Sequence, residues 1–172
     1  MRRMKWVERE FDFNLPVGVF PCVVERLRGT PARLEELTRA LPPPLLTARR
    51  DGAWSIQEHA GHLLDLDELH EGRLEDYAQR LAILRPADMT NRKTFEADHN
   101  AARLEDLLAA FRAARLNFVR RLEALSEEEV AASSLHPRLQ KQMRVIDMAC
   151  FVAEHDDHHL AVITETARTP AA

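Results

Sequence analysis

Glycine is scarce in this sequence, with five among 172 residues, and so are the runs of β-branched residues that favour strands. Alanine, leucine, arginine and glutamate dominate instead, and these residues favour helices. Such a composition is untypical of a β-sandwich or a barrel. We therefore expect a mostly α-helical protein.

Several motifs and segments that would indicate other classes of protein are also missing. The sequence has no glycine-rich phosphate loop and no CxxC motif. It has no stretch of 18 apolar residues and no visible signal peptide, so we expect no membrane partner. A net charge of −4 without a long basic run argues against nucleic acid as a partner. Cys22 and Cys150 lie far apart in apolar helical contexts, which predicts two buried, reduced thiols and a cytoplasmic protein.

Four amphipathic segments follow an irregular stretch at residues 1–18. An S-x-x-E capping box of Ser55 and Glu58 begins the second segment, and a similar box at residues 126–129 opens a short helical turn. Prolines end the first two segments, at 42–44 and at 86, and residues 86–99 form a connection long enough to span a bundle. The helices are expected at about 21–41 (kinked or divided near Gly29-Thr30-Pro31), 55–84, 100–125 and 140–167. Residues 1–172 are thus predicted to form one domain, an all-α four-helix bundle.

Histidines replace aliphatic residues at two consecutive positions on the apolar face of the last segment. Apolar residues recur there at alternating steps of three and four, the pattern by which one helix packs on another. His155 and His159 belong to this face, so both imidazoles are expected to point into the same interior space. Burying two imidazoles costs free energy unless their nitrogens find partners. A divalent metal is one such partner, and a hydrogen-bonded pair is the alternative.

A third histidine ligand is expected from the helix that begins after Ser55, where His59 and His62 lie in the first two turns. The helical periodicity places His59 nearer the centre of the apolar face and His62 toward its edge. His59 can also pack against Trp54 for purely structural reasons, so periodicity leaves this choice open. One histidine from here, together with two from the last helix, would leave an open coordination position, which suits a catalytic metal.

The other histidines are predicted to lie outside the ligand set. His158 is off the apolar face of its helix and is expected against a neighbouring helix or at the mouth of the site. His70 is too far along its helix to share a site with His59. His99 and His136 fall in segments that resemble loops, where histidines are usually solvated or cap a helix.

Carboxylates are frequent near these histidines. A ligating imidazole usually donates its second N–H to a carboxylate or a carbonyl. Asp65, one turn after His62, is therefore a candidate partner or general base. Glu58 is a second candidate, with a competing role in the capping box. Asp156 and Asp157 are expected on solvated helix surface.

Three short motifs resemble, in order and spacing, those of the DinB/YfiT-like superfamily. The segment from Trp54 to Asp65 is similar to the family pattern W-[ST]-x-x-[EQ]-x-x-x-H-L-x-D, and His136-Pro137 resembles its loop before the fourth helix. The segment HDDHHL at residues 155–160 is similar to H-x-x-H-H-L. Arg138 stands where the family usually has a glycine, so the geometry of this loop is not carried over.

The resemblance implies an up-down-down-up bundle with a long crossover between the second and third helices. It also implies one metal ligand from the second helix and two, four residues apart, from the fourth. In this sequence those ligands are His62, His155 and His159. The choice of His62 over His59 comes from the resemblance and not from periodicity.

Members of this family include S-transferases that use low-molecular-weight thiols, and hydrolases. The expected function is a metal-dependent enzyme with zinc or nickel that acts on a small-molecule substrate, with thiol transfer slightly preferred to hydrolysis. The alternative is a non-catalytic metal-binding module in a stress response or an interaction. Because bundles of this family often pair, we also expect a homodimer.

Overall fold

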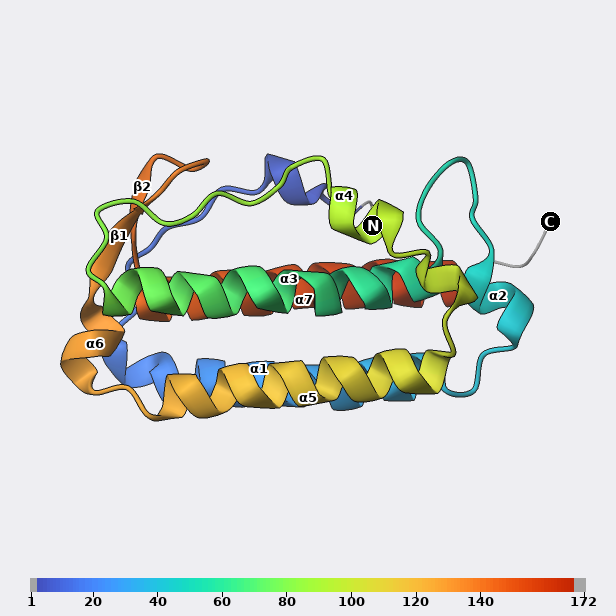
Figure 1. Ribbon diagram of the computed structural model, residues 1–172, viewed down its shortest axis with the longest axis horizontal. Coiled ribbons are helices and arrows are strands. Elements are labelled where there is room, and N and C mark those ends of the chain that lie inside the picture. The colour runs from blue at the N-terminus through green and yellow to red at the C-terminus, as the bar shows by residue number, and fades with distance from the viewer. Residues whose placement is uncertain (1–2, 169–172) are drawn as a thin grey trace.

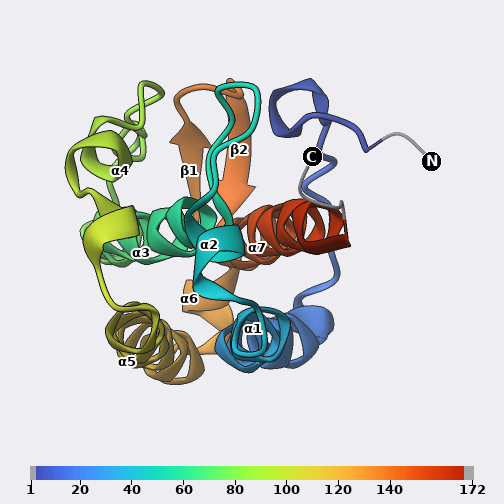
Figure 2. The same cartoon turned by 90° about the vertical axis from the view of Figure 1, so that its right-hand side faces the viewer.

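The computed structural model describes residues 3–168. Figure 1 shows the chain running one way along the first long helix, back along the second and third, and returning along the fourth. Viewed from the end in Figure 2, these four helices occupy the corners of a square. They are α1 (Phe20–Thr38), α3 (Ile56–Ala78), α5 (Leu104–Glu123) and α7 (Val145–Arg168). The predicted up-down-down-up bundle is confirmed, and α1 is continuous through Pro31.

The connections cover one face of this bundle. Figure 1 places the N-terminal segment, the crossover from α3 to α5 and a β-hairpin all above α3 and α7. The N-terminal segment is irregular as expected, with 3₁₀ turns at Trp6–Glu8 and Val17–Val19. The crossover contains the short helix α4 (Arg92–Glu96) and a 3₁₀ turn at His99–Ala101. The short helix α2 (Pro43–Thr47), in a segment expected to be loop, links α1 to α3.

The second long helix ends at Ala78, six residues before the expected end at Leu84. Arg80 adopts a left-handed φ of 54°. Its N–H bonds to the carbonyl of Tyr77, and the N–H of Leu81 bonds to that of Asp76. This is the Schellman pattern that closes helices, usually at a glycine. Because an arginine occupies the left-handed position, no residue in the sequence indicates that the helix ends here.

The expectation of a helix from residue 140 was wrong, because residues 133–144 form a hairpin. Strand β1 (Ser133–His136) pairs antiparallel with β2 (Lys141–Arg144), so that Ser133 lies opposite Arg144. Gln140, with a φ of 52°, lies in the turn between them. Before the hairpin, the second capping box opens α6 (Glu127–Ala131) as predicted.

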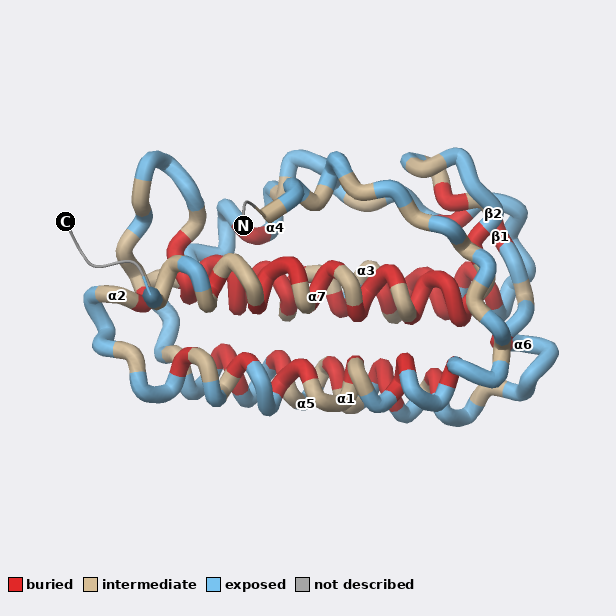
Figure 3. The backbone as a smooth tube through the Cα atoms, turned by 180° about the vertical axis from the view of Figure 1, so that it is seen from behind, coloured by how far each residue is buried: buried red, intermediate tan, exposed pale blue. Residues whose placement is uncertain are grey.

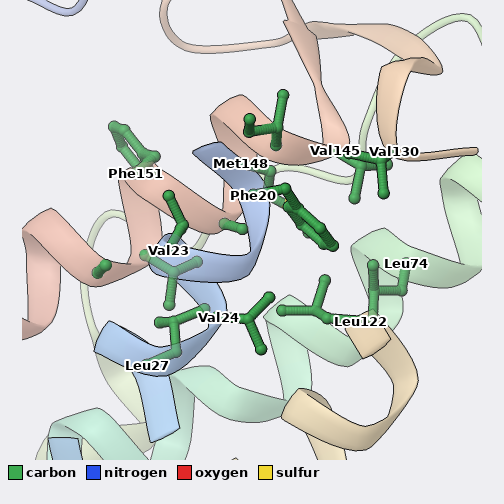
Figure 4. Packing of buried hydrophobic residues seen from close by; sticks show 14 of the residues in the cluster. Phe20, Val23, Val24, Leu27, Leu74, Leu122, Val130, Val145, Met148 and Phe151 are labelled. Atoms are coloured by element: carbon green, nitrogen blue, oxygen red, sulfur yellow. The ribbon is translucent and has the colours of Figure 1, made fainter. Parts of the chain in front are cut away.

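The bundle core consists of two apolar clusters separated by a polar layer. Figure 3 shows the buried residues on the facing sides of the long helices. One cluster gathers residues from Phe20 to Leu27 with parts of α3, α5 and α7, and Figure 4 shows this packing. The other lies toward the opposite end of the bundle, around Phe111 and Leu63. Between them all four helices contribute a buried polar side chain, namely Thr30, Asp67, Arg115 and Asp156.

Two expectations about exposure were wrong. Asp156 was expected in solvent, but it is buried and paired with Arg115 because it belongs to this polar layer. Cys22 was expected to be buried, but it is exposed, whereas Cys150 is half-buried; both are free thiols. Among residues 3–168, no helix combines the length and the apolar character that crossing a membrane requires.

Candidate metal centre

Three buried histidines converge where α3 packs against α7. His62 comes from α3, and His155 and His159 come from α7. Each offers a ring nitrogen, and these nitrogens all lie within 4.8 Å of one another. The capping box fixes the start of α3, because Ser55 accepts the N–H of Glu58 and the Glu58 carboxylate accepts the N–H of Ser55. The helix therefore presents His62 in its second turn, toward the histidines of α7.

Hydrogen bonds engage Nδ1 of His62 and of His159, and the Nε2 atoms of His155 and His159 face each other. The Nδ1 atoms of His159 and His59 are 2.8 Å apart, and Nδ1 of His62 is 3.0 Å from the hydroxyl of Thr94. These contacts leave Nε2 of His62 and of His159 free to bind a metal. Nε2 of His159 lies 3.1 Å from Nε2 of His155. Ligand nitrogens about 2.0–2.1 Å from a tetrahedral metal lie about 3.3 Å apart, so this donor set fits a divalent cation.

A second set of hydrogen bonds ties His62 to the crossover. The Thr94 hydroxyl donates to Asp65 over 2.8 Å and can accept the Nδ1–H of His62. Asp65 also bonds to Nε2 of His99, at 2.8 Å. The candidate partner Asp65 thus reaches His62 through the Thr94 hydroxyl. Such outer contacts fix the tautomer and the orientation of a ligating imidazole.

His99 was expected to be solvated or to cap a helix, but it is buried against α3. Gly61 makes this packing possible, because a Cβ at that position would lie 2.2 Å from the His99 ring. Nothing in the local sequence of the crossover indicates that Thr94 and His99 meet α3. The available signal was the glycine within an otherwise strongly helical segment.

The two candidate carboxylates differ in their surroundings. Burial alone would raise the pKa of Asp65, but hydrogen bonds from His99 and Thr94 outweigh it and hold the pKa below its usual value. Asp65 is therefore ionised at neutral pH and suited to hold a proton donor in place. Glu58 accepts from Arg49 and from the Ser55 backbone. Among residues 3–168, the hydrogen bonds of Glu58 stabilise the start of α3 and do not involve the histidines.

Burial keeps the clustered histidines uncharged. It lowers the pKa of His62 and of His59 to about 4, and it lowers the pKa of His155 and of His159 well below the usual value. A neutral imidazole is the form that binds a metal. His59 is thus buried beside His159 and also packs on the Trp54 ring, with centroids 5.5 Å apart. The structure brings both His59 and His62 inward, where periodicity had left the choice open.

The N-terminal segment covers α7 at the cluster. The Trp6 ring packs edge-on against His155, with centroids 4.9 Å apart. Arg3 lies 3.3 Å from Nε2 of His158, and His158 lines a cavity beside the three histidines. Nδ1 of His155 and Nδ1 of His158 are buried without a hydrogen-bond partner among the described residues.

A cavity of about 500 Å³ opens beside the three histidines and continues along α3. Both tryptophans, Trp6 and Trp54, line it. His136, which was also expected to be solvated or capping, is buried in its wall and accepts the N–H of Leu139 within the hairpin turn. This volume is within the usual range for small-molecule sites.

The fold and this histidine-lined cavity define a helical bundle with three buried histidines that could hold a metal ion. A family profile for the DinB superfamily matches residues 26–163, and the chain belongs to that family. The comparison with curated proteins gave no match.

Among solved structures, the chain is similar to YfiT from Bacillus subtilis. The two chains are 21% identical, with a TM-score of 0.81, over 94% of this chain and 93% of that one. YfiT is described as "a probable metal-dependent hydrolase with an unusual four-helix bundle topology". At this identity the likeness establishes the shared fold.

Proposed function

We propose that this protein is a metal-dependent hydrolase that holds one divalent cation, zinc or nickel, through His62, His155 and His159. The observation that carries the proposal is the convergence of three buried imidazoles, each with a ring nitrogen within 4.8 Å of the others, in the wall of a cavity. The similarity to YfiT, itself described as a probable metal-dependent hydrolase, supports the same reading.

When bound by three histidines with one position open, a divalent metal supplies a Lewis acid and brings the pKa of a coordinated water near neutrality. The residues of the chain hold and orient this centre. With Nε2 of His159 on the metal, its Nδ1–H would donate to Nδ1 of His59, and Thr94 with Asp65 would fix the ring of His62. The mostly apolar cavity wall excludes bulk water and binds the substrate, an ester or an amide.

Thiol transfer is the second candidate. A cavity of about 500 Å³ has room for a low-molecular-weight thiol beside a small electrophile. The same open coordination position would favour the thiolate form of such a thiol. A non-catalytic metal-binding module is less consistent with the structure, because a structural site is normally closed by a fourth ligand and has no cavity beside it.

The test uses zinc-loaded protein purified without a nickel column. It is assayed with a panel of nitrophenyl esters and anilides, and separately for transfer of glutathione or cysteine to an aryl halide. We expect hydrolysis in the wild type, its loss in His159→Ala, and its retention in Arg103→Gln, an exposed residue that does not line the cavity. Zinc-dependent thiol transfer without hydrolysis would select the second candidate. Neither activity in a zinc-loaded protein would contradict the enzyme proposal.

A further inference from the structure

The cavity beside the histidines follows one stripe of α3. His62, Leu66, Leu69 and Arg73 are spaced by four, three and four residues, so they share one face of the helix, and all four line the cavity. Eleven helical residues span about 16 Å. The cavity therefore extends from the three histidines, past two leucines, to a guanidinium group three turns away.

Arg73 is a buried cation without a carboxylate partner among the described residues. The residue is 2% exposed, and its Nε and Nη2 donate to the backbone carbonyl of Arg85 over 3.3 and 3.2 Å. The nearby carboxylate of Asp76 is already bound by the guanidinium and the N–H of Arg85. Burial lowers the pKa of Arg73 to about 10, so the group remains charged at neutral pH. A buried charge that lacks a counter-ion is costly, and sites that bind anions are one reason for such an arrangement.

A second arginine reaches the same end of the cavity from the β-hairpin. Arg138, in the turn between β1 and β2, is exposed and lines the cavity with Arg73. Burial is the main cause that lowers the pKa of His136 to about 4, and the charges of Arg73 and Arg138 lower this pKa further. His136 and the two arginines therefore lie in one region of positive potential. Among the described residues that line the cavity, one has a carboxylate, Asp88. This carboxylate accepts hydrogen bonds from Thr90 and Arg92 within its own loop.

We infer that this end of the cavity is a subsite for an anionic oxygen group, a carboxylate or a phosphate, with Arg73 as its main ligand and Arg138 as a second. Guanidinium groups bind both anions through paired N–H donors. The substrate class is then an acyl compound with an apolar middle that packs on Leu66 and Leu69 and a negatively charged far end. The assignment of the reacting end rests on the proposed hydrolase function, whereas the anion subsite stands on the cavity and the two arginines.

Intrinsic fluorescence provides a direct binding test, because both tryptophans of the chain line this cavity. Zinc-loaded protein is titrated with hexanoate, hexyl phosphate and the neutral hexanamide. We expect at least one anion to bind about tenfold more tightly than the amide, the gain typical of one charge-assisted hydrogen bond. The tighter of the two anions identifies the group that the subsite prefers.

Arginine variants locate the anion within the cavity. In Arg138→Gln we expect the preference for the anion to fall about threefold, because this arginine is exposed and screened. In Arg73→Met we expect a loss of about tenfold or more, with the helical circular dichroism spectrum checked first. Arg103→Gln removes the same charge at an exposed residue that does not line the cavity and is the matched control. If Arg73→Met fails to fold, Arg138→Gln and the wild-type preference decide the matter.

Two results would overturn the inference. One is equal affinity of the wild type for hexanoate, hexyl phosphate and hexanamide. The other is a preference for anions that is unchanged in the arginine variants, which would mean that the anion binds the metal.

Hydrolysis of a matched ester pair separates this inference from the proposed function. The 4-nitrophenyl monoester of adipate carries a terminal carboxylate, whereas 4-nitrophenyl hexanoate has a methyl group there. We expect kcat/KM to favour the charged ester about tenfold in the wild type and the ratio to fall in Arg138→Gln. If neither ester is hydrolysed but hexanoate binding depends on the arginines, the hydrolase proposal fails and the anion subsite stands. If both esters are hydrolysed with equal kcat/KM, the subsite is contradicted and the hydrolase stands.

Discussion

At the scale of single residues, the histidines of this site differ in what each ring nitrogen does. Nε2 of His159 faces the proposed metal position, and its Nδ1 contacts His59. His59 is thus placed to orient a ligand, while His159 is placed to be one. Metal content in variants distinguishes the two roles.

We predict that His159→Ala abolishes zinc binding, because two remaining imidazoles hold zinc poorly. His59→Ala should retain the metal with an affinity about 10–100-fold lower, the usual cost of losing an outer partner of a ligand. Elemental analysis and a competition titration with a zinc chelator measure both effects. If His59→Ala lost zinc while His159→Ala fully retained it, His59 would be the metal ligand and His159 its partner, the reverse of our assignment.

The Thr94 hydroxyl provides a second test, because it joins His62 to Asp65. Thr94→Val keeps the shape of the side chain and removes the hydroxyl. We expect zinc affinity to fall about tenfold with an unchanged circular dichroism spectrum. Thr164→Val is the matched control, since the hydroxyl of Thr164 bonds to the backbone of Leu160. Equal zinc affinity in the two variants would show that Thr94 does not support the metal site.

The sequence was informative about histidines on a regular helix and uninformative about residues in connections. His155 and His159 could be placed because helical periodicity puts positions four apart on one face. Thr94 and His99 could not, because the path of a 25-residue crossover (residues 79–103) has no period and depends on contacts with α3. The same limit applies to Arg138, which reaches the cavity through a hairpin turn that the sequence did not indicate.

At the scale of the elements, one polar layer connects the four long helices. Arg115 on α5 pairs with Asp67 on α3 and with Asp156 on α7, and Thr30 on α1 donates to Asp156 over 2.8 Å. All four side chains are buried. Burying an ion pair adds little net stability, but removing one partner leaves an uncompensated charge.

We predict that Asp156→Ala lowers the free energy of unfolding by about 3–5 kcal/mol, because Arg115 then loses one of its two buried carboxylates. Its neighbour Asp157 is half-exposed and pairs with Arg26 and Arg33. Asp157→Ala should therefore cost about 1 kcal/mol or less. Urea unfolding of the two variants makes the comparison, and equal losses would contradict a structural role for the layer.

Element boundaries were predicted well where capping residues are present and poorly where they are absent. The boxes at Ser55 and Ser126 set the starts of α3 and α6 as expected. The end of α3 was missed because Arg80 takes the position that glycine usually has. The hairpin was missed because its strands are four residues each and carry mostly polar side chains, so neither shows a clear alternation.

At the scale of the whole molecule, the buried histidines make the stability depend on pH. Burial lowers the pKa of His59, His62, His136 and His158 to about 4, from 6.5 in the unfolded chain. Between these values the unfolded state binds more protons than the folded state. The stability that these groups contribute is therefore complete above pH 6.5 and is lost as the pH falls toward 4.

For metal-free protein in EDTA, we predict that the free energy of unfolding falls steeply from pH 7 to pH 5. Each such histidine can remove up to about 1.4 kcal/mol per pH unit in this window. Asp67 opposes the trend, because burial raises its pKa to about 6 and its contribution is instead lost as the pH rises through 6. One carboxyl does not outweigh four histidines. Urea unfolding at pH 7, 6 and 5 measures the slope, and constant or rising stability toward pH 5 would contradict the burial of neutral histidines.

The bundle followed from the sequence pattern and its topology from the family resemblance, whereas the cavity followed from neither. Four amphipathic segments with a long connection after the second are enough to indicate the bundle. The cavity forms between α3, α7 and three irregular segments above them, whose positions no periodic pattern encodes. The expected homodimer and cytoplasmic location stay predictions.

The most direct test of the central claim is anomalous diffraction at the zinc edge from crystals of the zinc-loaded protein. We predict one peak, with nitrogens of His62, His155 and His159 about 2.0–2.1 Å away and a fourth position facing the cavity. A metal held by four side chains with no face toward the cavity would contradict the account. So would an absent peak together with a stability that is indifferent to added zinc.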